Sequence, residues 1–158
     1  MVLPEQAVIL LVEDRDDDVY LVRHALAKAR VYNPFFVVTD GEQAIAYLEG
    51  RDKYANREEY PPPDIMLLDL KMPRMDGFEV LQYVRSRDDF KALRIIALTS
   101  SEDLFDVNKA YEMGANSFLV KPLEFENYSA MMRTLASFWL HHSRTPTLER
   151  FSRRGQEA

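Results

Sequence analysis

The chain has 158 residues, of which 47% are hydrophobic, and this is ample for one domain with a single core. Its formal net charge of −6 disfavours sequence-independent binding to nucleic acid, which needs clustered Lys and Arg. The absence of cysteine excludes disulfides, thiolate metal sites and cysteine nucleophiles. The longest early apolar run, residues 7–12, is too short to span a membrane and lacks the basic start of a signal peptide. We therefore expect a cytoplasmic protein with no nucleic-acid or membrane partner.

Short apolar runs alternate along the chain with amphipathic helical patterns. The runs, each predicted to be a buried strand, are residues 7–12, 35–39, 64–68, 94–98 and 117–120. Apolar spacings of three and four residues predict helices around Val22–Ala29 and Val80–Val84, and further helices are predicted over residues 102–113 and 126–141. Five strands alternating with five helices predict an α/β fold, a doubly wound parallel sheet with helices on both faces.

The last predicted helix carries one broad apolar stripe. Its members are Tyr128, Met131, Met132, Leu135, Phe138 and Trp139. We interpret the stripe as core packing, and the alternative is that its edge forms a dimer or partner face.

Polar side chains follow the predicted strands, at the edge where an open α/β sheet binds its ligands. Those that we single out as candidate site residues are Glu13, Asp14, Asp69, Thr99 and Lys121. Asp40 and Gly41 follow the second strand, and we interpret them as a helix start because Asp is a good N-cap.

The carboxylates of Glu13, Asp14 and Asp69 would repel one another in a partly desolvated site. Lys121 alone offers one positive charge against three negative charges. A hard divalent cation suits this all-oxygen set, Mg²⁺ first, and Mn²⁺ or Ca²⁺ could take its place in a crystal. We therefore predict a magnesium site at this edge of the sheet.

Lys121 and Thr99 would add an ammonium and a hydroxyl beside Asp69. A carboxylate, a cation, an ammonium and a hydroxyl around one point are typical of a phosphoryl site. An aspartate, already ionised at neutral pH, can act as the covalent nucleophile without a base. We therefore predict that Asp69 becomes an aspartyl phosphate.

Four segments, LLVEDRDDD, LLDLKMPRMDG, ALTSS and GANSFLVKP, resemble the motifs of the response-regulator receiver domain of two-component signalling. The resemblance covers about residues 7–141 and implies the flavodoxin-like, CheY-like (βα)₅ fold. It also implies that Asp69 is the phosphoacceptor from a histidine kinase, and that Glu13 and Asp14 are the acidic pair that holds Mg²⁺ with it.

The same resemblance implies a switch. It identifies Thr99 as the switch hydroxyl, Lys121 as the phosphate-contacting lysine, and Phe118, three positions before that lysine, as the switch aromatic. Because Phe118 has no hydroxyl, any switching would be carried by where its ring packs; the alternative is an ordinary strand-end aromatic. The peptide bond before Pro122 is expected to be cis, which is inexpensive at proline.

Two further positions and three further segments refine the resemblance. Lys71 and Ser101 match positions that tune the lifetime of the phosphoryl group in the family by shaping access for water. The segments YPPPD, AYEMGANSFLVKP and FWL resemble the stand-alone regulators of bacterial and cyanobacterial phytochrome kinases. This narrower resemblance implies a phytochrome-type histidine kinase as partner and a homodimer through the last helix and neighbouring surface.

Two segments do not fit the predicted core. Residues 50–63, GRDKYANREEYPPP, are expected to form a solvated loop, with contact to the kinase or to a second subunit as the alternative. We assign residues 1–142 to the receiver domain and expect residues 143–158 to be a mobile tail, too short for a DNA-binding output domain.

Three classes of function remain. The first is a phosphorylation switch with no output domain, which docks to other proteins or passes its phosphoryl group on to a histidine phosphotransfer protein. The second is a phosphohydrolase resembling the haloacid dehalogenases, but its second acidic residue would stand where this chain has Lys71. The third is a passive receiver-like binding module. We predict the switch, a phosphoprotein with at most slow self-dephosphorylation and no other enzyme activity.

Overall fold

A computed structural model describes residues 3–142, so the segment 143–158 and the predictions made for it lie outside the described residues. Its strands form one parallel sheet in the order β2-β1-β3-β4-β5. The strands are β1 (Ile9–Val12), β2 (Phe35–Val38), β3 (Ile65–Leu68), β4 (Arg94–Thr99) and β5 (Ser117–Val120). The predicted doubly wound α/β sheet is confirmed, with its strand order reversing between β1 and β3.

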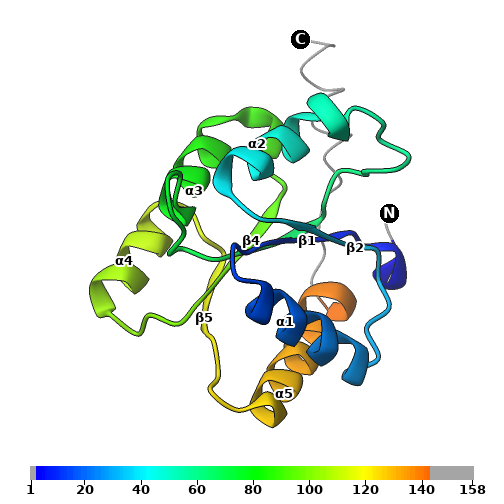
Figure 1. The fold of residues 1–158 in the computed structure, drawn as a ribbon, viewed down its shortest axis with the longest axis vertical. Helices are drawn as coiled ribbons and strands as arrows, with labels where there is room; N and C mark the ends of the chain where they lie inside the picture. The colour runs from blue at the N-terminus through cyan, green and yellow to red at the C-terminus, as the bar shows by residue number, and fades with distance from the viewer. Residues whose placement is uncertain (1–2, 143–158) are drawn as a thin grey trace.

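Helices cover both faces of the sheet. They are α1 (Asp16–Lys28), α2 (Gly41–Glu49), α3 (Gly77–Ser86), α4 (Leu104–Glu112) and α5 (Phe125–Leu135). Figure 1 shows α1 and α5 together on one face and α2, α3 and α4 on the other. The last predicted helix is divided, because α5 is followed by a π-helical segment, η4 (Ala136–His142). Within residues 3–142, no helix is long and apolar enough to cross a membrane.

The central strands β1 and β3 are apolar throughout because both faces of the sheet are covered. Every residue of β1 and β3 is buried, as expected for central parallel strands. The apolar stripe of the last helix packs into the core on the α1 side, where Tyr128, Met132 and Leu135 are buried. The core interpretation is therefore confirmed for α5, whereas Phe138 in η4 is 54% exposed.

Aspartate side chains cap the starts of three helices, α2, α3 and α4. The Asp40 Oδ1 atom accepts a hydrogen bond of 2.7 Å from the Gln43 backbone N–H, so the predicted N-cap is confirmed. The Asp76 Oδ1 atom accepts 2.9 Å from the Glu79 backbone N–H in the same way at the start of α3.

Gly77, the first residue of α3, is required by close packing. Its backbone N–H donates 3.2 Å to the carbonyl oxygen of Leu70. A Cβ atom at this position would lie 2.6 Å from the Leu70 Cα and would also clash with the Asp69 carbonyl. Only glycine therefore allows α3 to begin against the loop that follows β3.

The charged loop between α2 and β3 is largely exposed, as expected, but it is anchored to the core at a few residues. Tyr54 in this loop is only 4% exposed. Its ring lies 5.1 Å from the Tyr47 ring and 5.2 Å from the Tyr60 ring. The Arg57 guanidinium donates 2.7 Å to the Tyr47 carbonyl and 3.3 Å to the Leu48 carbonyl, near the end of α2. Aromatic packing and a guanidinium cap thus join the loop to the core.

The peptide bond before Pro122 is trans, so the expectation of a cis bond is wrong. No cis peptide bond occurs within residues 3–142. The trans form is the favoured isomer even at proline. In this form the Lys121 backbone N–H donates 2.8 Å to the Thr99 carbonyl.

We predict that Arg57→Ala lowers the free energy of unfolding by about 1–3 kcal/mol, because carbonyl groups near the end of α2 lose a charged donor. Urea unfolding followed by circular dichroism measures the change. Glu59→Ala is the matched control, because Glu59 is an exposed residue of the same loop. An equal loss in both variants would contradict the anchoring role of Arg57.

We predict that Gly77→Ala lowers the free energy of unfolding by about 1–3 kcal/mol, because the added methyl group overpacks the loop after β3. Glu79→Ala, at an exposed position of the same helical turn, should change it by less than about 0.5 kcal/mol. Thermal unfolding by calorimetry compares the two variants. If the Gly77→Ala protein is as stable as the wild type, the loop after β3 can shift to accommodate the methyl group without loss of stability, and the close-packing argument is wrong.

Candidate functional site

The predicted site residues meet at the carboxyl edge of the sheet. The parallel register of β1 with β3 brings Glu13 and Asp69 to the same level just beyond the two strands. Thr99, the last residue of β4, pairs with Val120, and Lys121 follows directly. These residues lie beside the point where the strand order reverses, which is the usual ligand position in this class of sheet.

Glu13, Asp14 and Asp69 form one acidic cluster. Each offers a carboxylate oxygen, and these oxygens lie within 4.8 Å of one another. The Asp14 Oδ1 atom is buried and has no hydrogen-bond partner within the described part of the chain. An orphaned carboxylate oxygen in an all-oxygen cluster fits a hard divalent cation. The donor set that the sequence predicts is therefore assembled by the fold.

Lys121 carries the positive charge that contacts this cluster. Its Nζ atom lies 2.6 Å from Glu13 Oε2, 3.1 Å from Asp69 Oδ2 and 3.0 Å from Asp18 Oδ2. The Lys121 side chain is only 8% exposed, so these ion pairs are poorly screened. Burial raises the pKa of the Glu13 carboxyl, and the negative charge of Asp69 adds to the effect, although the hydrogen bond from Lys121 opposes it.

Asp18 belongs to the candidate site but was not identified from the sequence. It lies in the first turn of α1, four residues after Asp14, and its side chain is 20% exposed. Three consecutive aspartates begin this helix, and acidic residues are favourable there for the helix dipole alone. The sequence alone therefore offers no reason to choose Asp18 from the three. The only signal is that this helix begins close to the sheet edge, so that one of its first side chains could reach the site.

The two oxygens of the Asp69 carboxylate have different partners. The Lys71 backbone N–H donates 3.0 Å to Oδ1, whereas Oδ2 accepts from the Lys121 ammonium. Thr99 is fully buried at the end of β4, and its hydroxyl oxygen accepts a long hydrogen bond of 3.5 Å from the Ser101 backbone N–H. The carboxylate is thus oriented by a loop amide on one side and an ammonium on the other.

The side chains of Lys71 and Ser101 meet on a residue that the sequence analysis did not identify. Both contact Asp106 Oδ2, Lys71 Nζ at 3.1 Å and Ser101 Oγ at 2.8 Å. The hydrogen bond from Ser101, followed by that from Lys71, lowers the pKa of the Asp106 carboxyl. Acidic residues are common in the first turn of a helix, so the sequence alone did not single out Asp106.

Phe118 lies apart from the carboxylates, on the side of the sheet that α4 covers. It is half-buried and packs against the core beneath α2, α3 and α4. Its backbone N–H donates 3.1 Å to the Tyr111 hydroxyl of α4. The ring therefore occupies a boundary position between core and surface.

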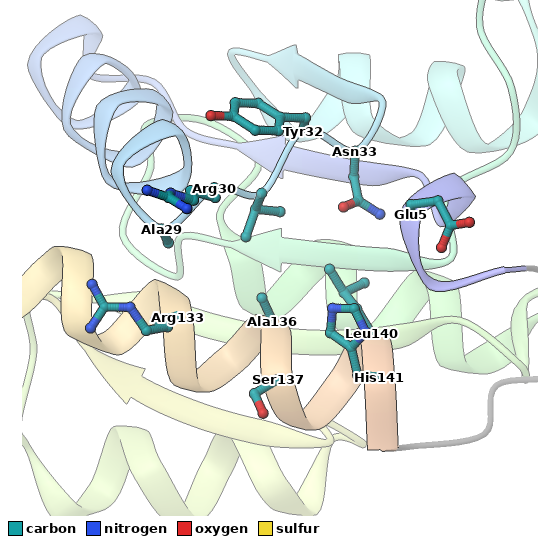
Figure 2. Close-up of a pocket in the computed structure, with 11 residues that line it drawn as sticks. Glu5, Ala29, Arg30, Tyr32, Asn33, Arg133, Ala136, Ser137, Leu140 and His141 are labelled. Atoms are coloured by element: carbon teal, nitrogen blue, oxygen red, sulfur yellow. The ribbon is translucent and has the colours of Figure 1, made fainter.

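A separate hollow of about 310 Å³ opens between the end of α1 and the last helical segment (Figure 2). Its lining includes Arg30, Asn33, Arg133 and His141. Because residues 29–33 precede β2, the hollow lies at the amino edge of the sheet, opposite the acidic cluster. It takes no part in the candidate site.

Comparison with known proteins gives a consistent result. Residues 9–133 match the response regulator receiver domain. Response regulator Rcp1 of Synechocystis sp. is 35% identical over 84% of this chain and 88% of its own length.

Solved structures show the same likeness. The response regulator RPA3017, described in red light signaling of R. palustris, matches with a TM-score of 0.86 and 37% identity over 89% of this chain and 99% of its own. The phosphorylated cyanobacterial phytochrome response regulator RcpA matches with a TM-score of 0.83 and 32% identity, over 90% and 99% of the two chains. A manganese-bound form of Rcp1 matches with a TM-score of 0.79 and 34% identity, over 89% and 99%. The chain therefore belongs to the response-regulator receiver family.

Proposed function

We propose that this protein accepts a phosphoryl group from a histidine kinase on Asp69 and signals by phosphorylation-dependent contacts with other proteins. The observation that carries the proposal is the Asp69 carboxylate itself. It is 4% exposed, is contacted by the Lys121 ammonium and stands in an acidic cluster at the ligand edge of a receiver fold.

The chemistry of the transfer follows from this arrangement. An oxygen of the Asp69 carboxylate attacks the phosphorus of a phosphohistidine. The O–P bond forms as the P–N bond breaks, and the electron pair of that bond stays on the imidazole nitrogen. The Lys71 amide orients the nucleophile, and the Lys121 ammonium stabilises charge on the phosphoryl oxygens.

Glu13, Asp14 and Asp69 would hold a divalent cation, with Mg²⁺ as the expected ion. The orphaned Asp14 oxygen supports a missing positive charge at this cluster. The bound cation would neutralise the carboxylates and the oxygens of the transferring phosphoryl group. The manganese-bound structure of the relative Rcp1 supports a divalent cation in this family.

Phosphorylation would then be read out through Thr99 and Phe118. The added negative charge draws the Thr99 hydroxyl and Lys121 toward the phosphoryl oxygens. The half-buried Phe118 ring moves further inward, and the surface formed by α4 and β5 changes. The contact of the Phe118 amide with Tyr111 supports a link between the two elements.

The kinase partner would be of the phytochrome type. The descriptions of RPA3017 in red light signaling and of RcpA as a phytochrome response regulator support this assignment. We also propose a homodimer through the last helix, where the exposed Phe138 ring lies edge-on to Trp139 at 5.0 Å between centroids. An exposed aromatic beside the helix end suits such a contact.

Hydrolysis of the phosphoryl group on Asp69 is expected to be slow, because the chain lacks the second acidic residue of a phosphohydrolase. The residue at that position is Lys71, and its ammonium is bound to Asp106. No feature of the described residues favours the hydrolase.

We predict that incubation with acetyl phosphate and Mg²⁺ adds one phosphoryl group to the wild type and none to Asp69→Asn, since the neutral amide oxygen is a far weaker nucleophile than the carboxylate. Intact-mass spectrometry measures the gain. The control is Asp76→Asn, which removes a carboxylate near the site but keeps the acceptor oxygen that begins α3. A gain that persists in Asp69→Asn would place the phosphoryl group elsewhere, and no gain in a folded wild type would refute the phosphoacceptor role.

We predict that Asp14→Asn weakens Mg²⁺ binding on the order of 10-fold or more, since even residues that only orient metal ligands commonly cost that much. Calorimetric titration measures the affinity, and EDTA should abolish phosphorylation of the wild type. Asp17→Asn removes the same charge from an exposed position of α1 and serves as the control. If Asp17→Asn weakens binding as much as Asp14→Asn, general electrostatics and not a ligand would explain the loss.

A further inference from the structure

One carboxylate of α4 joins the two loops that flank Asp69. Asp106 is 8% exposed, and a single oxygen of it, Oδ2, contacts both the Lys71 ammonium and the Ser101 hydroxyl. Lys71 belongs to the loop after β3, and Ser101 belongs to the loop after β4. Asp106 is therefore the point at which both loops are attached to α4.

Each of these loops also touches the phosphorylation site through its backbone. The Lys71 N–H donates to Asp69 Oδ1 at 3.0 Å, and the Ser101 N–H donates to Thr99 Oγ1 at 3.5 Å. The two residues that contact Asp106 are thus each two positions along the chain from Asp69 or Thr99. This geometry gives a direct physical link between the site and the start of α4.

The Lys71 ammonium is placed where two anions would compete for it. It is 56% exposed, so it is free to change partners at little desolvation cost, and it is bound to Asp106 when Asp69 carries no phosphoryl group. A phosphoryl group on Asp69 would bring close to two negative charges to a side chain two residues away. The Asp106 carboxylate carries one.

We propose that Asp106 is the resting-state partner of Lys71, and that phosphorylation of Asp69 draws Lys71 from Asp106 to the phosphoryl oxygens. The proposal rests on Asp69 being the phosphoacceptor. Loss of the ion pair releases the first turn of α4, where Leu104 and Phe105 are each 70% exposed. Asp106 is a positioning residue in this account, because it acts on the site only through Lys71 and Ser101.

The test uses beryllofluoride, a mimic of the phosphoryl group, with Mg²⁺ and the full chain. Asp106→Asn removes the carboxylate charge that competes for the Lys71 ammonium. The affinity of this variant for beryllofluoride should therefore rise about 2- to 5-fold over the wild type, the range expected for a partly exposed ion pair. Fluorine NMR titration measures the affinity. Glu102→Gln removes one charge from an exposed position beside Ser101, in the loop after β4, and should leave the affinity for beryllofluoride unchanged.

A double-mutant cycle separates this role from a merely structural one. In the Lys71→Ala background, Asp106→Asn should have no effect on beryllofluoride affinity, because no ammonium remains to be released. A gain that persists without Lys71, or an equal gain in Glu102→Gln, overturns the proposal. Circular dichroism confirms that each variant is folded.

A measurement on the wild type keeps the proposal testable even if a variant fails to fold. Nitrogen-15 NMR of the Lys71 ammonium should report a new partner when beryllofluoride is added, and an unchanged Lys71 signal on the bound protein overturns the inference. A wild type that takes up neither beryllofluoride nor a phosphoryl group would instead refute the proposed function, and the inference with it.

Discussion

Crowding of carboxylates around one buried ammonium dominates the functional edge of this protein. Lys121 lies within 3.1 Å of oxygens from Glu13, Asp18 and Asp69, and Asp14 adds a fourth carboxylate close by. The surplus of negative charge favours any species that brings positive charge. A change in charge on Asp69 must therefore alter the partners of several neighbours together.

The sheet makes this crowding possible because its central strands cannot move apart to relieve it. β1 and β3 are buried along their whole length, with cores packed on both faces. Close-packed interiors are stiff, so the strand ends hold their carboxylates at fixed separations. Gly77 tightens the arrangement further, because α3 begins against the backbone of Asp69 and Leu70. Rearrangement is left to the side chains and loops beyond the strands.

The surrounding elements differ in how firmly they are held. The loop before β3 is joined to α2 by a cluster of tyrosine rings and by the Arg57 guanidinium. In α4, by contrast, only Asp106 and Ala110 are buried. Its first turn is joined to the neighbouring loops by polar contacts that water can replace. Local stability follows buried apolar contact, so α4 is the element that a charge change at the site can shift most easily.

The sequence by itself determined the order of strands and helices and the residues at the strand ends, because apolar periodicity and N-caps are local signals. From parallel strands alone it followed that Glu13, Asp14, Asp69 and Lys121 share one edge. Only the tertiary structure decided that α1 returns a fourth carboxylate to that edge and that α4 supplies the partner of Lys71. The aromatic anchoring of the loop before β3 was likewise decided by tertiary contacts. Such contacts join residues far apart in the chain, and helix packing sets the side-chain directions that make them, which no local pattern encodes.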